Sequence, residues 1–343
     1  MTEGVADGGP LDVCGIGSAI VDILVEAELA VVSGAGLVKG TMHLMDLDAS
    51  ERVHAQVPGG RQRCGGSAAN TIAGLACLGA RTGFIGRVAD DRFGQVFVDD
   101  LAELGVHFGS AGAAASPEWA TGRCLILVTP DADRTMCTTL GVAAHLAPAH
   151  LDIDLIERAR ITYFEGYLWD EPVARSAIRR AISASHAAGG RVAMSLSDPF
   201  CVDRHRVEWR ELVDHQLDVV FANESELCSL AEVDDLAEAC RRIRRPGLLV
   251  TVTRGPRGAW VFGEDGPIIE VSAHEPPQVV DTTGAGDLYA AGFLYGLVRD
   301  LDPERCARLG GITAAEIISH VGARPDASLP ELVEPVLRTP AGL

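Results

Sequence analysis

The second half of the chain alternates short apolar runs with helix-like segments, and this alternation constrains the fold more than any other feature. Strands are predicted at 161–165, 192–196, 218–221 and 248–253, and helices at 172–188, 203–214, 223–230 and 236–243. Apolar runs that lack polar alternation are typical of strands buried on both faces. The pattern therefore predicts an α/β fold with a mostly parallel central sheet flanked by helices on both faces.

The first 140 residues follow a different pattern after a predicted strand at 11–16. Residues 26–57 mix short apolar runs with glycines, and runs at 123–129 and 134–140 flank a Pro-Asp-Ala-Asp turn, as expected of a hairpin. We expect the strands of 26–57 to stand apart from the main sheet. The sequence contains no long linker, so residues 1–343 are predicted to form a single unit.

Composition narrows the range of partners. The chain has 29 basic and 48 acidic residues, a net charge of −19, which argues against a nucleic-acid or anionic-membrane surface. Lys39 is the one lysine, which nearly excludes a P-loop. No apolar run reaches the roughly 18–20 residues of a membrane span. The nine cysteines are scattered singly. We therefore expect a cytoplasmic protein with reduced thiols.

A Gly-rich turn near the C-terminus is the strongest candidate for chemistry. The stretch V-D-T-T-G-A-G-D at 280–287 leads into an apolar, helix-like segment. Gly284 and Gly286 free the backbone to point N–H groups at one place, and a helix N-terminus favours an anion there. Asp287 follows in the first helical turn. It is either an ordinary N-terminal charge or a base held beside an anion site.

A second Gly-rich turn, Gly65-Gly66, precedes a helix predicted at 71–78. Ligands of parallel sheets bind beyond the carboxyl ends of the strands, which makes the polar residues near those ends candidates for a shared cleft. These candidates are Asp22, Tyr167, 197–200, Asn223 and 253–255. A Gly15-x-Gly17 pair also suggests a dinucleotide site, but Ile20 replaces the third glycine of that fingerprint.

Together the two turns resemble the signatures of the ribokinase-like (PfkB-type) family of sugar and nucleoside kinases. D-T-T-G-A-G-D at 281–287 resembles the C-terminal signature, and G-G-S-A-A-N at 65–70 with G-F-I-G-R-V-A-D-D-R-F-G at 83–94 resembles the N-terminal one. The resemblance covers nearly the full length. It implies a ribokinase-like fold with a small β-sheet lid, built from segments within 19–56 and 106–140, that closes over the acceptor.

The resemblance also implies ATP-dependent phosphoryl transfer to a hydroxyl group. Asp287 would accept the hydroxyl proton, and the turn formed by Gly284, Ala285 and Gly286 would bind the developing anion. Arg134, at the mouth of the predicted hairpin, would clamp a phosphate. The alternative for Arg134 is a solvated arginine in a hairpin.

Nucleotide and metal positions follow from the same resemblance. Asn223 and Glu226 match an N-x-x-E motif that acts near Mg²⁺ and the nucleotide phosphates, with Glu226 reaching the metal through water; the same residues also read as a capping box. Thr253, Gly255 and Gly258 match the loop that approaches ATP. Asp281 and Thr283 match positions that hold a monovalent cation such as K⁺ in relatives.

The acceptor is expected to be a small-molecule nucleoside or sugar. Asp22, Gly65, Gly66 and Asn70 match positions that hold ribose hydroxyls, and Tyr167 and Phe200 fall where the adenosine kinases of this family contact the base. This favours the 5′-hydroxyl of adenosine, which would give AMP. Three departures from that pattern, at Ser195, Asp198 and Leu168, leave open an inosine or guanosine kinase, or a sugar kinase of the ribokinase type. Either a monomer or a lid-mediated homodimer is compatible with the resemblance.

Overall fold

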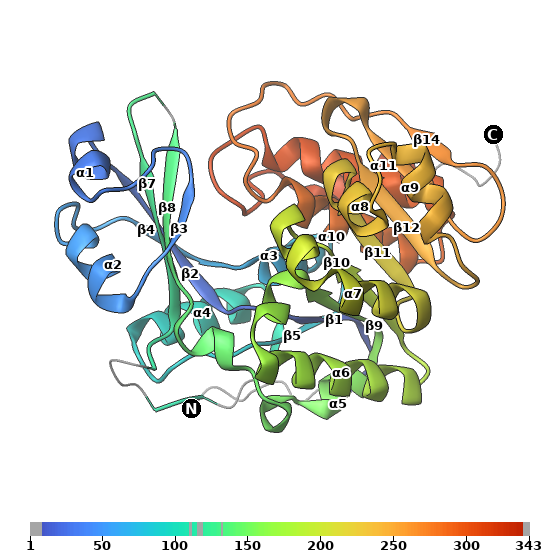
Figure 1. The fold of residues 1–343 in the computed structure, drawn as a ribbon, viewed down its shortest axis with the longest axis horizontal. Helices are drawn as coiled ribbons and strands as arrows, with labels where there is room; N and C mark the ends of the chain where they lie inside the picture. The colour runs from blue at the N-terminus through green and yellow to red at the C-terminus, as the bar shows by residue number, and fades with distance from the viewer. Residues whose placement is uncertain (1–8, 110–111, 115–118, 132, 339–343) are drawn as a thin grey trace.

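A computed structural model describes residues 9–109, 112–114, 119–131 and 133–338, and Figure 1 shows their arrangement. Within these residues the large sheet has nine strands in the order β14-β13-β12-β11-β10-β9-β1-β5-β6. The strands are β1 (Leu11–Ile16), β5 (Thr82–Ile85), β6 (His107–Gly109), β9 (Ala159–Glu165), β10 (Arg191–Ser195), β11 (Val219–Asn223), β12 (Leu249–Thr253), β13 (Ala259–Phe262) and β14 (Ile269–Val271).

The large sheet is parallel from β6 through β12, and β13 and β14 are added antiparallel at one edge. This confirms the predicted mostly parallel sheet. Strand β1 lies between β5 and β9, so the order of the strands reverses beside β1. In open parallel sheets the crevice at such a reversal is the usual ligand site.

Helices cover both faces of the large sheet, as predicted. One layer contains α3 (Ser67–Cys77), α4 (Arg92–Glu103), α10 (Ala285–Leu297), α11 (Pro303–Ile317) and α12 (Leu329–Arg338). The other contains α5 (Ile153–Glu157), α6 (Pro172–Ala187), α7 (Pro199–His215), α8 (Glu224–Ala231) and α9 (Leu236–Ile243). Successive side chains of β9 point to opposite faces of the sheet: Tyr163 packs against the first layer of helices and Phe164 against the second.

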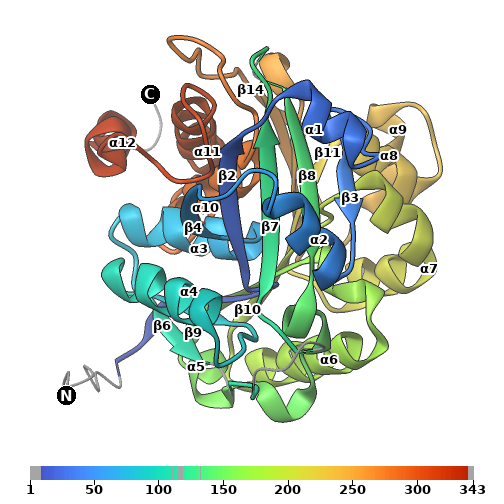
Figure 2. The same cartoon turned by 90° about the vertical axis from the view of Figure 1, so that its left-hand side faces the viewer.

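A small sheet stands at one side of the molecule (Figures 1 and 2). In the described residues its strand order is β3-β8-β7-β2-β4. The strands are β2 (Ile20–Glu26), β3 (Met42–Leu44), β4 (Arg61–Gly65), β7 (Gly122–Val128) and β8 (Arg134–Thr139), and α1 (Leu29–Gly34) and α2 (Leu47–His54) accompany them. β7 and β8 form the predicted antiparallel hairpin, although Ala132 in its turn lies outside the described residues.

The small sheet does not coincide with the intervals 19–56 and 106–140. Strand β4, which pairs antiparallel with β2, lies outside both intervals. Its sequence, R-Q-R-C-G, is mostly charged or polar, so it carries no apolar strand pattern. Strand β6 lies inside the second interval but belongs to the large sheet, where it pairs with β5. Residues 110–111 and 115–118 of that interval are outside the described part.

Two helices begin earlier than predicted. Helix α3 starts at Ser67 rather than residue 71, directly after Gly66, whose φ of 96° most side chains cannot adopt. Helix α7 starts at Pro199 rather than 203, because the Asp198 side chain accepts a hydrogen bond from Phe200 N (2.7 Å) as an N-cap. Across the described residues, no helix has both the length and the apolar character that a membrane span requires.

Helix α10 is packed closely on two sides, which fixes the position of its N-terminus. A Cβ at Gly74 of α3 would lie 2.6 Å from a methyl group of Leu288, so α3 and α10 approach through a glycine. On the other side, a Cβ at Gly292 would lie 2.5 Å from the Leu309 carbonyl oxygen of α11. Small residues therefore set both helix–helix distances.

Replacing Gly292 with alanine should destabilise the fold. The added methyl group would collide with a backbone carbonyl, which cannot rotate away, so we expect unfolding to become easier by ~1–3 kcal/mol. Urea denaturation followed by circular dichroism measures this change. Gly34→Ala, at the end of α1 with no atom within 4 Å of the new Cβ, is the control and should change stability by less than about 0.5 kcal/mol. Equal stability of both variants would contradict the packing described.

Candidate active site

A cavity of about 820 Å³ lies between the carboxyl ends of the central strands and the small sheet. The large sheet contributes Glu165, Ser195, Asn223 and Thr253 to its lining. The small sheet contributes Ile20, Asp22, Met42, Leu44, Cys124, Met136 and Thr138, and the turn before α10 together with its first residues contributes 282–287. The two Gly-rich turns, 220 positions apart in sequence at Gly66 and Gly286, therefore meet at one cavity.

The N-terminus of α10 has the geometry of an anion site. Gly284 adopts φ 78°, ψ 0° and precedes the first helical residue. The N–H of Ala285 is already used, because it donates to the Thr282 carbonyl (3.2 Å). Gly286 and Asp287 occupy the next positions, where a helix offers its own N–H groups no acceptor. Of the N–H groups of Ala285, Gly286 and Asp287, those of Gly286 and Asp287 therefore remain as donors for an anion.

Asp287 is partly buried, and donors from α3 hold both of its carboxylate oxygens. Ser67 Oγ donates to Oδ1 (2.7 Å), and Asn70 Nδ2 donates to Oδ2 (3.0 Å). Thr71 Oγ1 donates to the Asp287 carbonyl (3.1 Å). Burial raises the pKa of Asp287 to about 6, although both side-chain hydrogen bonds act in the opposite direction. The carboxylate is therefore oriented and ionised above that pH.

Asp22 lies on the opposite wall, in the middle of β2. Its carboxylate fits against Gly65: a Cβ at that glycine would lie 2.4 Å from the Asp22 carboxyl carbon. Gly66 lies against the Ser18 carbonyl, which a Cβ would approach to 2.2 Å. Burial raises the pKa of Asp22 to about 7, with the charge of Asp287 adding to the increase. Two carboxylates thus face one cavity.

Glu165, at the end of β9, is a site residue that the sequence did not indicate. It is 1% exposed, and its oxygens accept hydrogen bonds from Ser18 N (2.9 Å) and Ala68 N (2.8 Å). A Cβ at Gly17 would lie 2.7 Å from Glu165 Oε2. The Gly15-x-Gly17 pair is therefore explained by packing, since Gly15 likewise lies against Ile72. Glu165 ties the end of β1 to the start of α3.

Arg324 is the second residue that sequence reasoning missed. It follows α11, and its Nη1 donates to Asn70 Oδ1 (3.2 Å) while its Nη2 donates to the Cys64 carbonyl (2.8 Å). Its charge lowers the pKa of both Asp22 and Asp287, against the larger effect of burial. An arginine in the loop between α11 and α12 offers no periodic signal, so only the folded structure brings it to the site.

The predicted base-contacting residues line the cavity but differ in exposure. Tyr167 is 42% exposed and donates its hydroxyl to the Ser197 carbonyl (3.2 Å), whereas Phe200 is 72% exposed. Ser197 itself adopts a left-handed φ of 66° and accepts a hydrogen bond from Gly166 N (2.9 Å). The Asp198 carboxylate caps α7 through one of its oxygens. The tyrosine is thus fixed in place, while the phenylalanine is open to solvent.

Asn223 and Glu226 form a capping box at the start of α8. Asn223 N donates to Glu226 Oε2 (2.9 Å), Asn223 Nδ2 donates to Glu226 Oε1 (2.6 Å), and Glu226 N donates to Asn223 Oδ1 (2.9 Å). Both side chains also line the cavity. Burial raises the pKa of Glu226 to about 7. The structural interpretation of this motif as a helix cap therefore holds, and both residues remain at the cavity.

The predicted nucleotide loop is only partly at the cavity. Thr253, the last residue of β12, lines it. Gly255 and Gly258 belong to the turn that joins β12 to β13 and do not line either cavity described here for residues 9–338. Gly258 has φ 83° and lies against the Val271 carbonyl, which a Cβ would approach to 2.0 Å. Its conformation lets the β12–β13 turn pack against the end of β14.

Arg134 and the predicted cation residues occupy the same place. The Arg134 guanidinium forms an ion pair with Asp281 and lies 3.3 Å from Thr283 Oγ1. The Asp281 oxygens also accept hydrogen bonds from Thr283 N and Gly322 N (2.9 Å each). As arranged, the Asp281 carboxylate is neutralised by an arginine, which does not fit a monovalent cation held by that side chain.

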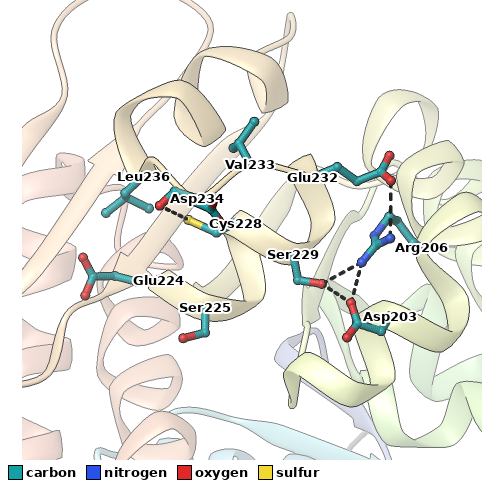
Figure 3. Close-up of a pocket in the computed structure, with 10 residues that line it drawn as sticks. All are labelled: Asp203, Arg206, Glu224, Ser225, Cys228, Ser229, Glu232, Val233, Asp234 and Leu236. Atoms are coloured by element: carbon teal, nitrogen blue, oxygen red, sulfur yellow. Dashed lines mark hydrogen bonds and ion pairs between the residues drawn. The ribbon is translucent and has the colours of Figure 1, made fainter.

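A second cavity, of about 660 Å³, lies between α7 and α8 and is shown in Figure 3. Its lining includes the carboxylates of Asp203, Glu224, Glu232 and Asp234, with Arg206 as the one basic lining residue. Arg206 is occupied by Asp203 and Glu232 (Figure 3). With Arg206 already paired, this lining offers a phosphate no free cation.

Comparison with known proteins decides the family. The family model described as pfkB family carbohydrate kinase matches residues 37–331. The chain belongs to the pfkB family of carbohydrate kinases. The crystal structure of adenosine kinase from Sinorhizobium meliloti is 40% identical, with a TM-score of 0.87 and coverage of 95% of this chain and 99% of that one. A probable sugar kinase from Rhizobium etli CFN 42 is 38% identical, with a TM-score of 0.87 and coverage of 95% and 98%.

A relative found by sequence acts on a different kind of acceptor. The 5-dehydro-2-deoxygluconokinase of Listeria monocytogenes is 27% identical over 273 residues, which is 74% of this chain and 80% of the relative. These likenesses confirm the ribokinase-like fold and the family that the two Gly-rich signatures indicated. This pfkB kinase is an ATP-dependent enzyme, and the acceptors of its family are small-molecule sugars or nucleosides.

Replacing Gly65 with alanine should weaken acceptor binding by the kinase selectively. The added Cβ would displace the Asp22 carboxylate, so we expect the acceptor KM to rise about tenfold or more, with the ATP KM nearly unchanged. Steady-state kinetics with each substrate varied in turn measures the difference. Gly263→Ala is the matched control, because the nearest atom to its new Cβ, Leu248 O, is 3.7 Å away. A parallel rise of both KM values in Gly65→Ala would contradict the prediction that Asp22 binds the acceptor.

Proposed function

We propose that this kinase transfers the γ-phosphoryl group of ATP to the 5′-hydroxyl of a nucleoside, with adenosine as the leading acceptor. One observation carries the proposal: Asp22, Asp287 and Asn223 line a single cavity, and Asp287 lies at the helix N-terminus within it. An acceptor held by Asp22 and a phosphate held at α10 would meet beside the Asp287 carboxylate. Phosphoryl transfer depends mainly on such positioning and on charge stabilisation.

Asp287 suits the role of base. Ser67 and Asn70 fix the direction of its carboxylate, and a pKa of about 6 leaves it ionised at neutral pH but ready to accept a proton. The first-turn N–H groups of Gly286 and Asp287 would stabilise charge on the transferred group. The small sheet would act as a lid that excludes water, since an open site would transfer phosphate to water.

The cavity favours a neutral acceptor with an apolar part. Apolar side chains from the small sheet, from the residue after β8 and from the turn after β9 line the cavity: Ile20, Met42, Leu44, Met136, Leu140 and Leu168. Carboxylates at Asp22, Glu165 and Asp198 also line it, and a fourth, Asp170, is paired there with Arg204 (2.8 Å). A sugar acid would meet these negative charges, whereas a nucleobase would bury an uncharged ring against the apolar wall. This supports a nucleoside over a gluconate-type acceptor.

Arg134, with its partner Asp281, and Glu226 are the residues that would bind the phosphate groups and their Mg²⁺. Arg134 would clamp a phosphate after exchanging its partner Asp281, and Glu226 would contact Mg²⁺ through water. Bound Mg²⁺ would neutralise phosphate charge. Across the described residues no group of three or more His, Cys, Asp or Glu is placed to hold a metal ion. A magnesium ion held mostly by phosphate oxygens and water needs few protein ligands.

A sugar kinase of the ribokinase type is the second candidate. It is favoured by the 72% exposure of Phe200, which gives a base little cover on that side. The inosine and guanosine alternatives came from three departures, at Ser195, Asp198 and Leu168, of which Asp198 adds a carboxylate to the pocket. That carboxylate uses one oxygen to cap α7, and we therefore rank these acceptors below adenosine.

An acceptor screen tests the proposal directly. The kinase is incubated with ATP and Mg²⁺ and with adenosine, inosine, guanosine, cytidine, ribose, fructose or 5-dehydro-2-deoxygluconate, and product formation is followed by ³¹P NMR. We expect adenosine to give the highest kcat/KM and the phosphate to reside on the 5′-oxygen. Ribose or the sugar acid as the best substrate would overturn the nucleoside proposal.

Excess chelator should abolish turnover, because it removes the Mg²⁺ that would neutralise the phosphate charge.

Removing the proposed base should affect turnover far more than binding. In Asp287→Asn the side chain keeps its size but cannot accept the proton, so we expect kcat to fall about 10²–10⁴-fold. The dissociation constant for ATP, measured by calorimetry, should change less than about threefold, because the N–H groups of the turn remain. Asp302→Asn, which alters only the N-cap of α11, is the control for a general Asp-to-Asn effect. Unchanged kcat in Asp287→Asn would eliminate the base assignment.

A further inference from the structure

We infer that Arg324 is a positioning residue for phosphoryl transfer, one that sets the orientation of the Asn70 amide and balances the charge of the carboxylates around the acceptor. The inference rests on the proposed function of the same cavity. It assigns a role to a residue that lies outside both Gly-rich signatures and does not itself line the cavity.

The contacts of Arg324 join three parts of the fold. Its Nη1 donates to Asn70 Oδ1 (3.2 Å) in α3, and its Nη2 donates to the Cys64 carbonyl (2.8 Å) in β4. Asp100 of α4 lies 3.8 Å from Nη2 and accepts a hydrogen bond from Cys64 N (2.9 Å). The side chain is 16% exposed, so this geometry is held by protein contacts rather than by solvent.

These contacts determine which way the Asn70 amide faces. Asn70 Oδ1 receives the guanidinium, so Nδ2 is left to donate to Asp287 Oδ2 (3.0 Å). The reversed amide would place its NH₂ group against the guanidinium and its oxygen against the carboxylate, and both contacts would be repulsive. Arg324 therefore orients the Asp287 carboxylate indirectly, because it fixes the Asn70 amide that donates to it.

The segment that carries Arg324 is anchored on both sides of it. Gly322 N donates to Asp281 Oδ2 (2.9 Å), which links the segment to the turn before α10. Asp326 N and Ala327 N both donate to Glu316 Oε1 (2.9 Å each). Glu316 is 7% exposed and also contacts His320 Nε2 (3.0 Å). A buried carboxylate bound in this way holds the loop, and with it the guanidinium, in one place.

The electrostatic effect of Arg324 works in the same direction as its contacts. Its charge lowers the pKa of Asp22 and of Asp287, which burial otherwise raises to about 7 and about 6. The other polar or titratable groups facing Asp287 come from α3, β2, β9 and the turn after β9: Ser67, Asn70, Asp22, Tyr163, Glu165 and Tyr167. Arg324 is the one cation in that set.

Two substitutions separate orientation from charge. Arg324→Gln removes the positive charge and the guanidinium that orients Asn70. Arg324→Lys keeps the charge but lacks the planar guanidinium that donates to Asn70 and to the Cys64 carbonyl at the same time. We expect the acid limb of kcat/KM for the acceptor to move up by about one pH unit in Arg324→Gln and to stay near its wild-type position in Arg324→Lys. Both variants should lose about tenfold to a hundredfold in kcat, with the ATP KM nearly unchanged. Arg63→Gln is the control and should match the wild type, because Arg63 lies next to Cys64 on β4 and pairs with Asp100 from an exposed position.

Thermal unfolding provides a readout that does not require turnover. At pH 5 Asp22 and Asp287 are largely protonated, so losing Arg324 costs less; at pH 8 they are ionised and the loss costs more. The Tm difference between wild type and Arg324→Gln should therefore widen from pH 5 to pH 8. A constant Tm difference together with an unmoved acid limb would overturn the role of Arg324. If the wild type phosphorylates none of the acceptors screened, the proposed function fails, and the pH dependence of Tm still decides whether Arg324 balances these carboxylates.

Discussion

The contact between the first turns of α3 and α10 is the interaction on which the site depends. Ser67 and Asn70 donate to the two oxygens of Asp287, across 217 or more positions of sequence. The helices can approach this closely because Gly74 presents no side chain to Leu288 and Ala291. Each Gly-rich signature thus supplies one half of a single hydrogen-bonded unit. A shift of either helix would misdirect the carboxylate.

The site gathers negative charge in a way that opposes folding. Asp22, Glu165 and Asp287 all have pKa values raised by burial, so keeping them ionised at neutral pH costs stability. Local interactions offset this cost. The backbone N–H groups of Ser18 and Ala68 donate hydrogen bonds to Glu165, and the positive charge of Arg324 lowers the pKa of Asp22 and Asp287. Buried carboxylates with raised pKa values are expected where a protein positions a base beside an anion site.

The sequence predicted the large sheet well because its strands are buried on both faces and carry an unbroken apolar signal. It missed β4, since R-Q-R-C-G has no such pattern and its pairing depends on β2. The Gly-rich turns could be found because few residues tolerate their conformations. Glu165 and Arg324 could not, because a single charged residue in a strand or a loop acquires its partners only when distant segments meet.

Motif matching also gave overlapping roles that the structure separates. The same resemblance gave Arg134 a phosphate role and gave Asp281 and Thr283 a cation role, yet the Arg134 guanidinium pairs with Asp281 and contacts Thr283. Asn223 and Glu226 satisfy each other as a helix cap while still facing the cavity. Residue types alone do not show when two predicted ligands would bind each other instead of a substrate or ion. That depends on which side chains lie in contact in the folded protein.

The central claim is that a partly buried Asp287, oriented by α3, is ionised near neutral pH as the base of the site. The most direct test is its titration by ¹³C NMR, with aspartate carboxyl carbons labelled and Asp287 assigned from the difference between wild type and Asp287→Asn. The difference spectrum separates Asp287 from Asp22, which a kinetic profile does not. The account predicts a midpoint of about 6. A midpoint of about 4, the value of a solvated aspartate, would contradict it.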